Sequence, residues 1–179
     1  MEDFIKQHPD FSVRGAKGII ALTGYEGVLG YRTQEENSKA PGYAEEVEQA
    51  TAVANRLKEL GWRFASHSWG HRNMPTITMS SFLWDTNHWD SEVRPILGDT
   101  DLFIYPFGAG VEAQGDKHKV LRDRNFNLFF DVGTGIGHSE RGEYLYFTRR
   151  NIDGVYFRTF RNRDDKLFDI DKVIDKKFR

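Results

Sequence analysis

The sequence predicts an α/β fold, in which short buried strands alternate with amphipathic helices. The first observation is a set of apolar runs, each followed by a polar or glycine-rich loop, at residues 18–23, 62–65, 102–105 and 127–132. The second is a helix over residues 44–60, whose apolar side chains recur at helical spacing before the stop at Gly61. In such folds ligands gather at the carboxyl ends of the strands, so the loops there are where a site is expected.

Length and composition narrow the class of protein. The chain has 179 residues, which predicts a single domain over residues 1–179 with a sizeable core. Its apolar content of 39% is typical of a globular protein, and it contains no cysteine, which excludes disulfides and thiolate chemistry. A net charge of −2 and a pI near 6.3 give no basic surface for nucleic acid. The N-terminus shows no signal-peptide pattern and no run approaches a membrane span.

The remaining elements are predicted from local patterns. Ser80 or Ser81 can cap a helix that runs toward residue 96, and a short charged helix is expected over residues 116–124. Further expectations are two aromatic strands joined by a turn, and a small terminal helix, over residues 144–147, 155–160 and 170–174. Within the helix after Ser81, the spacing of Trp84, His88 and Trp89 favours core packing over a platform for a sugar.

Two histidines mark the strongest candidate site. His67 and His71 lie four residues apart in the loop that follows the strand at residues 62–65. Two imidazoles at close spacing suit a borderline metal such as zinc, although a catalytic zinc needs a third protein ligand and an open position for water. The alternative is that both are ordinary loop histidines.

The residues around this pair resemble a known family. The sequence His67-Ser68-Trp69-Gly70-His71, after an apolar strand and a helix that ends in Leu-Gly-Trp, resembles the second motif of the polysaccharide deacetylase family, the NodB homology domain of carbohydrate esterase family four. Tyr105-Pro106-Phe107-Gly108, which also follows an apolar strand, resembles that family's third motif, a wall of the substrate groove. The resemblance spans roughly residues 18–160.

This resemblance implies a metal-dependent deacetylase on a partial or distorted (β/α) barrel. It implies that His67 and His71 hold a divalent metal, expected to be zinc, together with one aspartate, and that a neighbouring aspartate acts as the base. The implied substrate is an N- or O-acetylated carbohydrate, in a groove beside Tyr105 and Pro106 with an oxyanion-stabilising N–H near Phe107. Members of the family are often extracellular or associated with the cell wall.

The chain departs from the family at its carboxylates. The family's Asp-Asp pair precedes the histidine motif, whereas the only aspartates before His67 are Asp3 and Asp10, and neither follows an apolar strand. The family's last motif, Leu-x-His, is also not visible. The chain is therefore expected to resemble a deacetylase domain that begins after its first strand.

Three other residues at strand ends are candidate site residues: Tyr25 and Glu26 as loop residues, and Asp131 as part of the substrate groove, with Glu26 and Asp131 also able to substitute for the missing carboxylates. Tyr25 and Glu26 follow the strand at residues 18–23, and Asp131 lies near the end of the strand at residues 127–132. Each also has an ordinary explanation, as part of a flexible loop or as the acceptor of a hydrogen bond from a turn amide. Arg150 and Asp153 are weaker alternatives, since Asp153 also fits a hairpin turn.

Three functions remain open from the sequence. The first is a metal-dependent deacetylase in which another carboxylate completes the site, the second is an inactive carbohydrate-binding relative, and the third is an interaction domain with structural histidines. A missing first strand also predicts an open sheet edge at residues 18–23, covered either by residues 1–14 or by a second copy of the chain in a symmetric homodimer.

Overall fold

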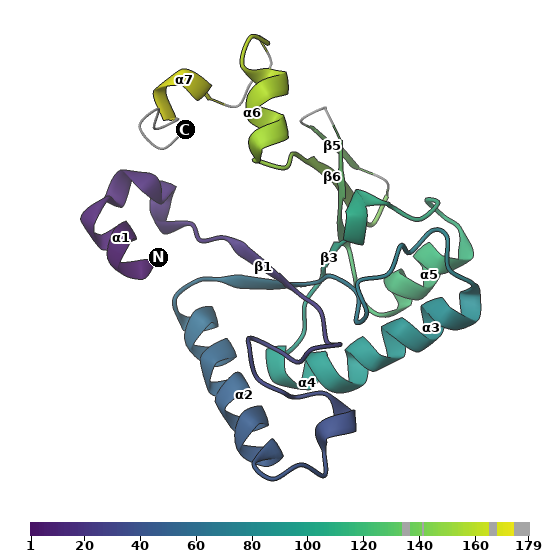
Figure 1. Ribbon diagram of the computed structural model, residues 1–179. Coiled ribbons are helices and arrows are strands. Elements are labelled where there is room, and N and C mark those ends of the chain that lie inside the picture. The colour runs from purple at the N-terminus through teal and green to yellow at the C-terminus, as the bar shows by residue number, and fades with distance from the viewer. Residues whose placement is uncertain (134–136, 141, 165–167, 174–179) are drawn as a thin grey trace.

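The computed structural model describes residues 1–133, 137–140, 142–164 and 168–173. Its centre is a six-stranded sheet with the order β1-β2-β3-β4-β6-β5 (Figure 1). The strands are β1 (Ile19–Leu22), β2 (Arg63–Ser66), β3 (Leu102–Ile104), β4 (Leu128–Val132), β5 (Gly137–Glu140) and β6 (Leu145–Arg149). All neighbouring pairs are parallel except β5 and β6. The mixed α/β class, with a mostly parallel sheet that agrees with a deacetylase-type fold, is confirmed.

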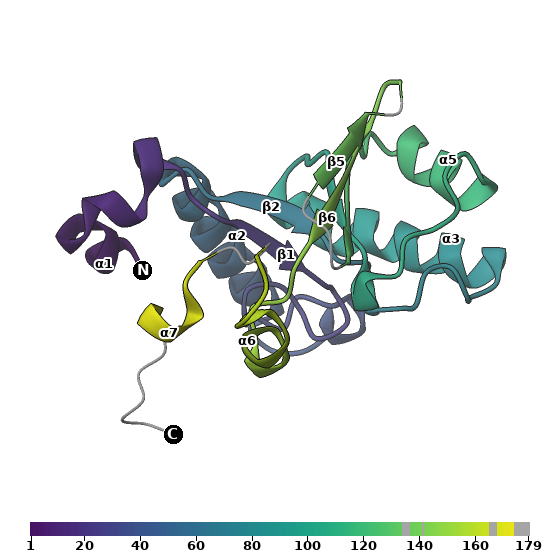
Figure 2. The ribbon, with the colours of Figure 1, turned by 90° about the horizontal axis from the view of Figure 1, so that it is seen from above.

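Helices cover one face of this sheet. The α-helices are α1 (Glu2–Gln7), α2 (Tyr43–Glu59), α3 (Met79–His88), α4 (Arg94–Leu97), α5 (Asp116–Asp123), α6 (Gly154–Phe160) and α7 (Ile170–Val173). In Figures 1 and 2, α2, α3 and α4 lie on the same side of the sheet, and α6 and α7 lie toward the opposite side. Short 3-10 turns and one π-helical turn connect these elements: η1 (Pro9–Phe11), η2 (Val13–Gly15), η3 (Glu35–Asn37), η4 (Trp89–Val93) and η5 (Pro106–Gly108).

Capping explains two differences from the sequence prediction. The expected strand at residues 155–160 is wrong, because this segment is helix α6: the Asp153 carboxylate accepts a hydrogen bond of 2.8 Å from Tyr156 N and thereby acts as its N-cap. The helix predicted from Ser80 or Ser81 begins instead at Met79, with Thr78 as the cap. It does not run unbroken to residue 96, since η4 separates α3 from α4, whose first turn contains a proline.

The core is rich in aromatic side chains between the sheet and its covering helices. Phe82, Trp89, Phe103 and Phe129 are all no more than 2% exposed. This burial confirms a core position for Trp89, but the same expectation was wrong for Trp84, which is 46% exposed. A separate small apolar cluster forms around α6 and α7 near the C-terminus and contains Tyr156, Phe160 and Ile170.

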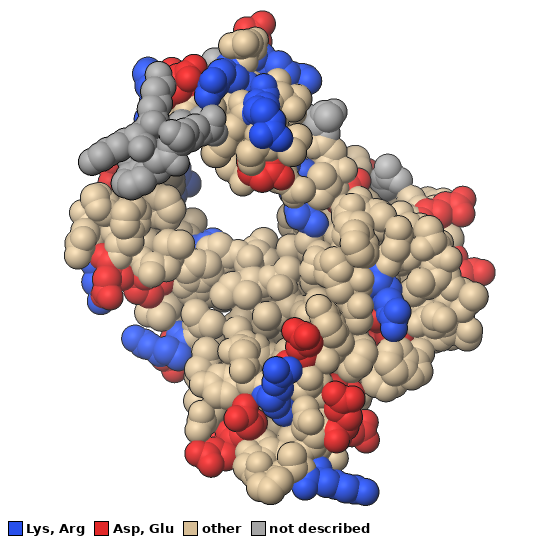
Figure 3. Space-filling view, in the orientation of Figure 1, with Lys and Arg blue, Asp and Glu red and all other residues tan. Residues whose placement is uncertain are grey.

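Strand β1 forms one edge of the sheet. Within the described part of the chain its only strand partner is β2, and Ile19 is 39% exposed. The N-terminal segment folds as α1, η1 and η2 rather than as a pairing strand, and Glu2 ties it to Lys17 and to the indole of Trp62. Figure 3 shows an opening in the molecule between this segment, β1 and the C-terminal helices. No described helix is long and apolar enough to span a membrane.

Candidate functional site

The loop after β2 brings the two predicted histidines together. The rings of His67 and His71 have centroids 4.9 Å apart and are inclined by 66°. Nδ1 of His67 lies 2.6 Å from the carbonyl oxygen of Ile104 at the end of β3. A carbonyl oxygen only accepts, so Nδ1 carries the proton and Nε2 keeps a lone pair, the arrangement found in histidines that bind metals. Burial lowers the pKa of His67, which favours this neutral form.

A buried carboxylate fixes the shape of this loop. Asp85 on α3 is fully buried, and its two oxygens accept hydrogen bonds of 2.9 Å from Trp69 N and 2.8 Å from Gly70 N. Burial raises the pKa of Asp85, and the two backbone N–H groups oppose that shift. Sequence reasoning missed this residue. An acidic side chain between core positions Phe82 and Trp89 was the available signal, since a buried carboxylate requires partners.

Three residues at the histidine site have strained backbone conformations. Ser68, His71 and Phe107 have positive φ angles of 58°, 50° and 58°, in a region that residues with a Cβ atom rarely adopt. The hydroxyl of Ser68 accepts a hydrogen bond of 3.1 Å from Arg72 N, which helps to close the turn between the histidines. Residues held in this conformation cluster at functional sites, where the surrounding structure maintains them.

The segment predicted as a groove wall is only partly exposed. The Phe107 side chain is 66% exposed, and its ring lies 4.7 Å from the ring of His71, measured between centroids. Tyr105 and Pro106 are buried, and the Tyr105 hydroxyl lies 3.1 Å from that of Tyr146. Gly108 is required by close packing, because a Cβ there would lie 2.4 Å from Cβ of Val132. Phe107 therefore supplies the exposed surface of this segment beside the histidines.

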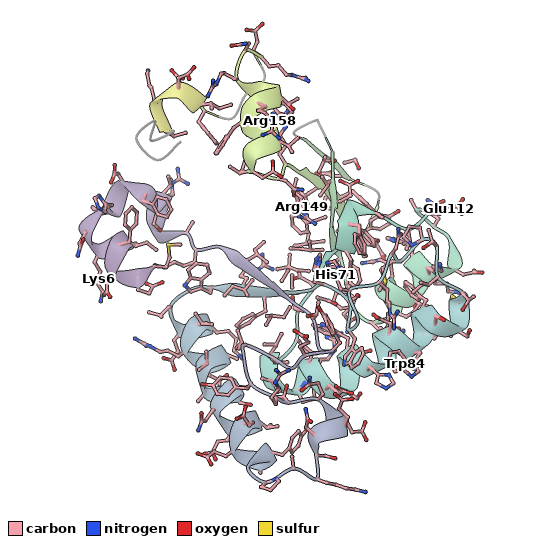
Figure 4. All side chains as sticks on the ribbon, viewed as in Figure 1. Lys6, His71, Trp84, Glu112, Arg149 and Arg158 are labelled. Atoms are coloured by element: carbon pink, nitrogen blue, oxygen red, sulfur yellow. The ribbon has the colours of Figure 1, made fainter. Side chains whose placement is uncertain are left out.

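Asp131 and Arg149 lie at the ends of neighbouring strands on the same rim. Asp131 Oδ1 is buried without a hydrogen-bond partner among the described residues. Burial lowers the pKa of Arg149, and the charge of Asp131 opposes this effect. Nη2 of Arg149 donates to Tyr105 O at 3.2 Å, and its positive charge also lowers the pKa of His67. Figure 4 shows Arg149 and His71 at the same end of the sheet.

Arg149 was not predicted as a site residue. The expected strand ended at residue 147, whereas β6 continues to Arg149 and carries it to the rim. The sequence analysis considered Arg150 and Asp153 instead. Asp153 caps α6, and Arg150 lies with its guanidinium carbon 4.5 Å from the centroid of Phe160.

The loop after β1 also reaches the histidine loop. Gly24 N and Tyr25 N both donate to the carbonyl oxygen of Trp69, at 2.9 and 3.1 Å. Gly24 is needed for this approach, because a Cβ at this position would lie 2.3 Å from Cδ1 of Trp69. The side chains of Tyr25 and Glu26 are exposed.

These residues fit a metal only in part. His67 and His71 offer two nitrogen ligands, but the described residues contain no group of three or more His, Cys, Asp or Glu side chains that could hold an ion. Neither Glu26 nor Asp131 therefore joins the histidines as a third ligand. A catalytic zinc site needs three protein ligands, so the described residues do not form a complete one.

Comparison with known proteins gives the family. The family model for polysaccharide deacetylase matches residues 35–128, a segment that begins at η3 and includes both histidines, the Tyr105–Gly108 segment and the first residue of β4. No curated protein and no solved structure matches the chain. The match covers more than half of the sequence and includes the strands and loops on which the histidine site is built, so the chain belongs to the polysaccharide deacetylase family.

Proposed function

We propose that this chain carries the histidine half of a metal-dependent carbohydrate deacetylase site, which removes acetyl groups from a carbohydrate by hydrolysis. The observation that supports this proposal best is the fixed histidine pair. The ring centroids of His67 and His71 lie 4.9 Å apart, and the carbonyl oxygen of Ile104 orients the ring of His67. These features are what a zinc-binding pair requires from its surroundings.

The proposal requires a carboxylate that the described arrangement does not supply. It could come from Glu26 or Asp131 after a movement of its loop or strand end, or from an additional strand beside β1. The position of β1, which pairs only with β2 among the described strands, supports the second source, because a parallel strand added beside it would end at the same rim as β2. The acetylated carbohydrate would then lie along Phe107 and Gly108, beside the rim that carries Asp131 and Arg149.

A second candidate function is carbohydrate binding without hydrolysis. Two observations support it. Asp131 lies close enough to Arg149 to affect the pKa of Arg149, so the rim carries charged groups that could bind hydroxyls. Among the described residues, no third metal ligand accompanies the histidines. In that case the exposed Phe107 and the charged rim would still contact a carbohydrate while the reaction is lost.

Zinc uptake tests the histidine site without relying on activity. The metal-free protein, His67→Ala and His71→Ala are dialysed against zinc, and the bound metal is measured. We expect each substitution to weaken zinc binding at least tenfold, roughly the loss of one ligand (about 1.4 kcal/mol or more). His88→Ala is the matched control, because His88 lies on α3 and stacks on Trp84 instead. Equal zinc uptake by all four proteins would contradict the proposed metal site and favour structural histidines.

Activity and zinc uptake together separate the two candidate functions. The protein is incubated with N-acetylated chito-oligosaccharide and zinc, and released acetate is measured. Hydrolysis that a chelator abolishes would show that Glu26 or Asp131 completes the site in this chain. Binding of the oligosaccharide without acetate release is expected both of the histidine half alone, which still takes up zinc through His67 and His71, and of the second candidate, which takes up none.

A further inference from the structure

A concave surface lies on the other side of the histidine loop. It is a pocket of about 510 Å³, within the range of small-molecule sites. The η3 turn and the residues after it form one wall, and α3 and η4 form the other. Trp69, which lies between the two histidines in the sequence, connects this pocket to the candidate site.

Aromatic rings form one side of the pocket. The ring of His88 stacks on Trp84 with centroids 3.8 Å apart, and Trp69 meets Trp84 edge to face at 5.1 Å. Trp84 is 46% exposed, so its side chain is not part of the buried core. Figure 4 labels Trp84 on the outer side of α3. An ordered and exposed indole beside a pocket is a typical surface for binding a cation or a sugar ring.

The charges of the lining select between these ligands. Three carboxylates line the pocket, those of Glu35, Glu36 and Glu92, against the single ammonium group of Lys39. Glu92 is held in place, because its Oε2 accepts a hydrogen bond of 2.9 Å from Nε1 of Trp69. Such a lining repels phosphates and carboxylates. The combination of aromatic faces and carboxylates is suited to an organic cation.

We propose that this pocket binds an unacetylated amino-sugar unit, with its ammonium group beside the Trp84–His88 stack and the pocket carboxylates. The inference rests on the proposed function, because removal of an N-acetyl group from a hexosamine produces this cation. It also refines that function: the substrate would be an N-acetylated chain that is already partly deacetylated, and the pocket would hold one free amine while the histidine rim faces an acetylated unit.

Calorimetric binding tests this inference with three trimers of the same linkage. They are the unacetylated glucosamine trimer, its fully N-acetylated form and the neutral glucose trimer. We expect the unacetylated trimer to bind at least tenfold more tightly than either of the others, with an affinity that falls as salt is added. Equal affinity for the three trimers, or no binding of the unacetylated one, would overturn the proposal.

Variants locate the ligand on the protein. Trp84→Ala should weaken binding of the unacetylated trimer about tenfold, in line with a desolvated cation–π contact, and Glu36→Gln should weaken it several-fold. Phe11→Ala is the control, because Phe11 is also an exposed aromatic residue (60%) and lies outside the pocket. Circular dichroism verifies that each variant is folded. Unchanged binding by Trp84→Ala would place the ligand elsewhere and contradict the inference.

The double variant His67→Ala/His71→Ala separates this inference from the proposed function. It should bind no zinc and still bind the unacetylated trimer with unchanged affinity. Loss of trimer binding in this variant would show that the amine is recognised at the histidine rim, and the separate pocket would be wrong. Failure of the wild-type protein to bind zinc would contradict the metal site while the pocket could still be tested.

Discussion

The two sides of the Ser66–Arg72 loop differ in how charge is arranged. On one side His67 and His71 contact the end of β3 and share the rim with Arg149. On the other side Trp69 lies in a pocket lined by three glutamates, of which Glu92 binds its indole N–H. The same short loop thus separates a rim that carries the two histidines, Asp131 and Arg149 from a pocket lined mainly by carboxylates.

This difference bears directly on metal binding. A catalytic zinc needs a third protein ligand beside the histidines, and no described carboxylate near this loop supplies it. Asp85 binds the backbone of the loop, Glu92 binds Trp69, and Asp131 lies near Arg149. The two histidines are therefore well oriented, but the described residues supply no third metal ligand beside them. On the other side of the loop, Trp69 lines a pocket of about 510 Å³.

The largest expected effect is the absence of hydrolysis. A general base contributes about 10²–10⁴-fold to such reactions, and no described carboxylate is placed beside the histidines to take a proton from water. We expect acetate release by the purified chain with zinc to stay within about twofold of the rate without protein, allowing for that missing contribution. Robust turnover would break the comparison and would direct attention to Glu26 and Asp131, whose Gln and Asn variants should then be inactive.

The next largest effect concerns the residue on which both sides depend. Asp85→Ala leaves the N–H groups of Trp69 and Gly70 without their acceptor, and we expect it to lower the free energy of unfolding by about 2–4 kcal/mol in denaturant titrations. Zinc uptake and binding of the amino-sugar trimer should both weaken. Asp99→Ala is the control, because its side chain is 98% exposed and should change stability by less than about 0.5 kcal/mol. A stable Asp85→Ala protein with normal binding would show that the loop holds its shape without this anchor.

The parts of the fold that could be predicted are those with a local signal. The strands β1 to β4 and helix α2 follow from apolar runs and helical spacing, and the rule that ligands collect at the carboxyl ends of strands brought His67 and His71 into view. Helix α6 was predicted as a strand because aromatic residues dominate residues 155–160, and the capping bond of Asp153 decided otherwise.

The contacts of the site depend on positions far apart in sequence. Asp85 meets the loop from a helix 15 residues away, and Arg149 reaches Tyr105 from a strand 44 residues later. The exposure of Trp84 was predicted wrongly for a different reason. Trp84 and Trp89 are five residues apart, which places them about 140° apart around an α-helix, and Trp84 lies at the surface while Trp89 is buried.

A smaller effect is expected at the edge of the sheet. Because β1 pairs on one side only among the described residues, we predict weak self-association through this edge, as an isologous dimer, in light scattering over a range of concentrations. Ile19→Lys should weaken the association at least tenfold, because a charged side chain on an edge opposes strand pairing. Val53→Lys, a change at a similarly exposed position on α2 (37%), should leave it unchanged. A monomer at all concentrations would rule out this role for the edge and leave it available for an added strand.

The smallest expected effect is a difference in pH dependence between the two sides of the loop. Burial lowers the pKa of His67 below its ordinary value near 6.5, so the unfolded chain binds a proton more readily than the folded one. The contribution of neutral His67 to stability is therefore complete above about pH 6.5 and is lost as the pH falls through the lower pKa of the folded state. The free energy of unfolding of the metal-free protein, measured from about pH 7.5 to about pH 5.5, should fall as the pH falls.

His67→Asn should reduce this dependence of the unfolding free energy on pH, because the variant has no group to protonate there, while Trp84→Ala on the other side of the loop should keep it. The raised pKa of Asp85 acts in the opposite direction, since its contribution is lost as the pH rises, but it is present in both variants and cancels in the comparison. Equal slopes for wild type and His67→Asn would show that protonation of this ring is not coupled to folding.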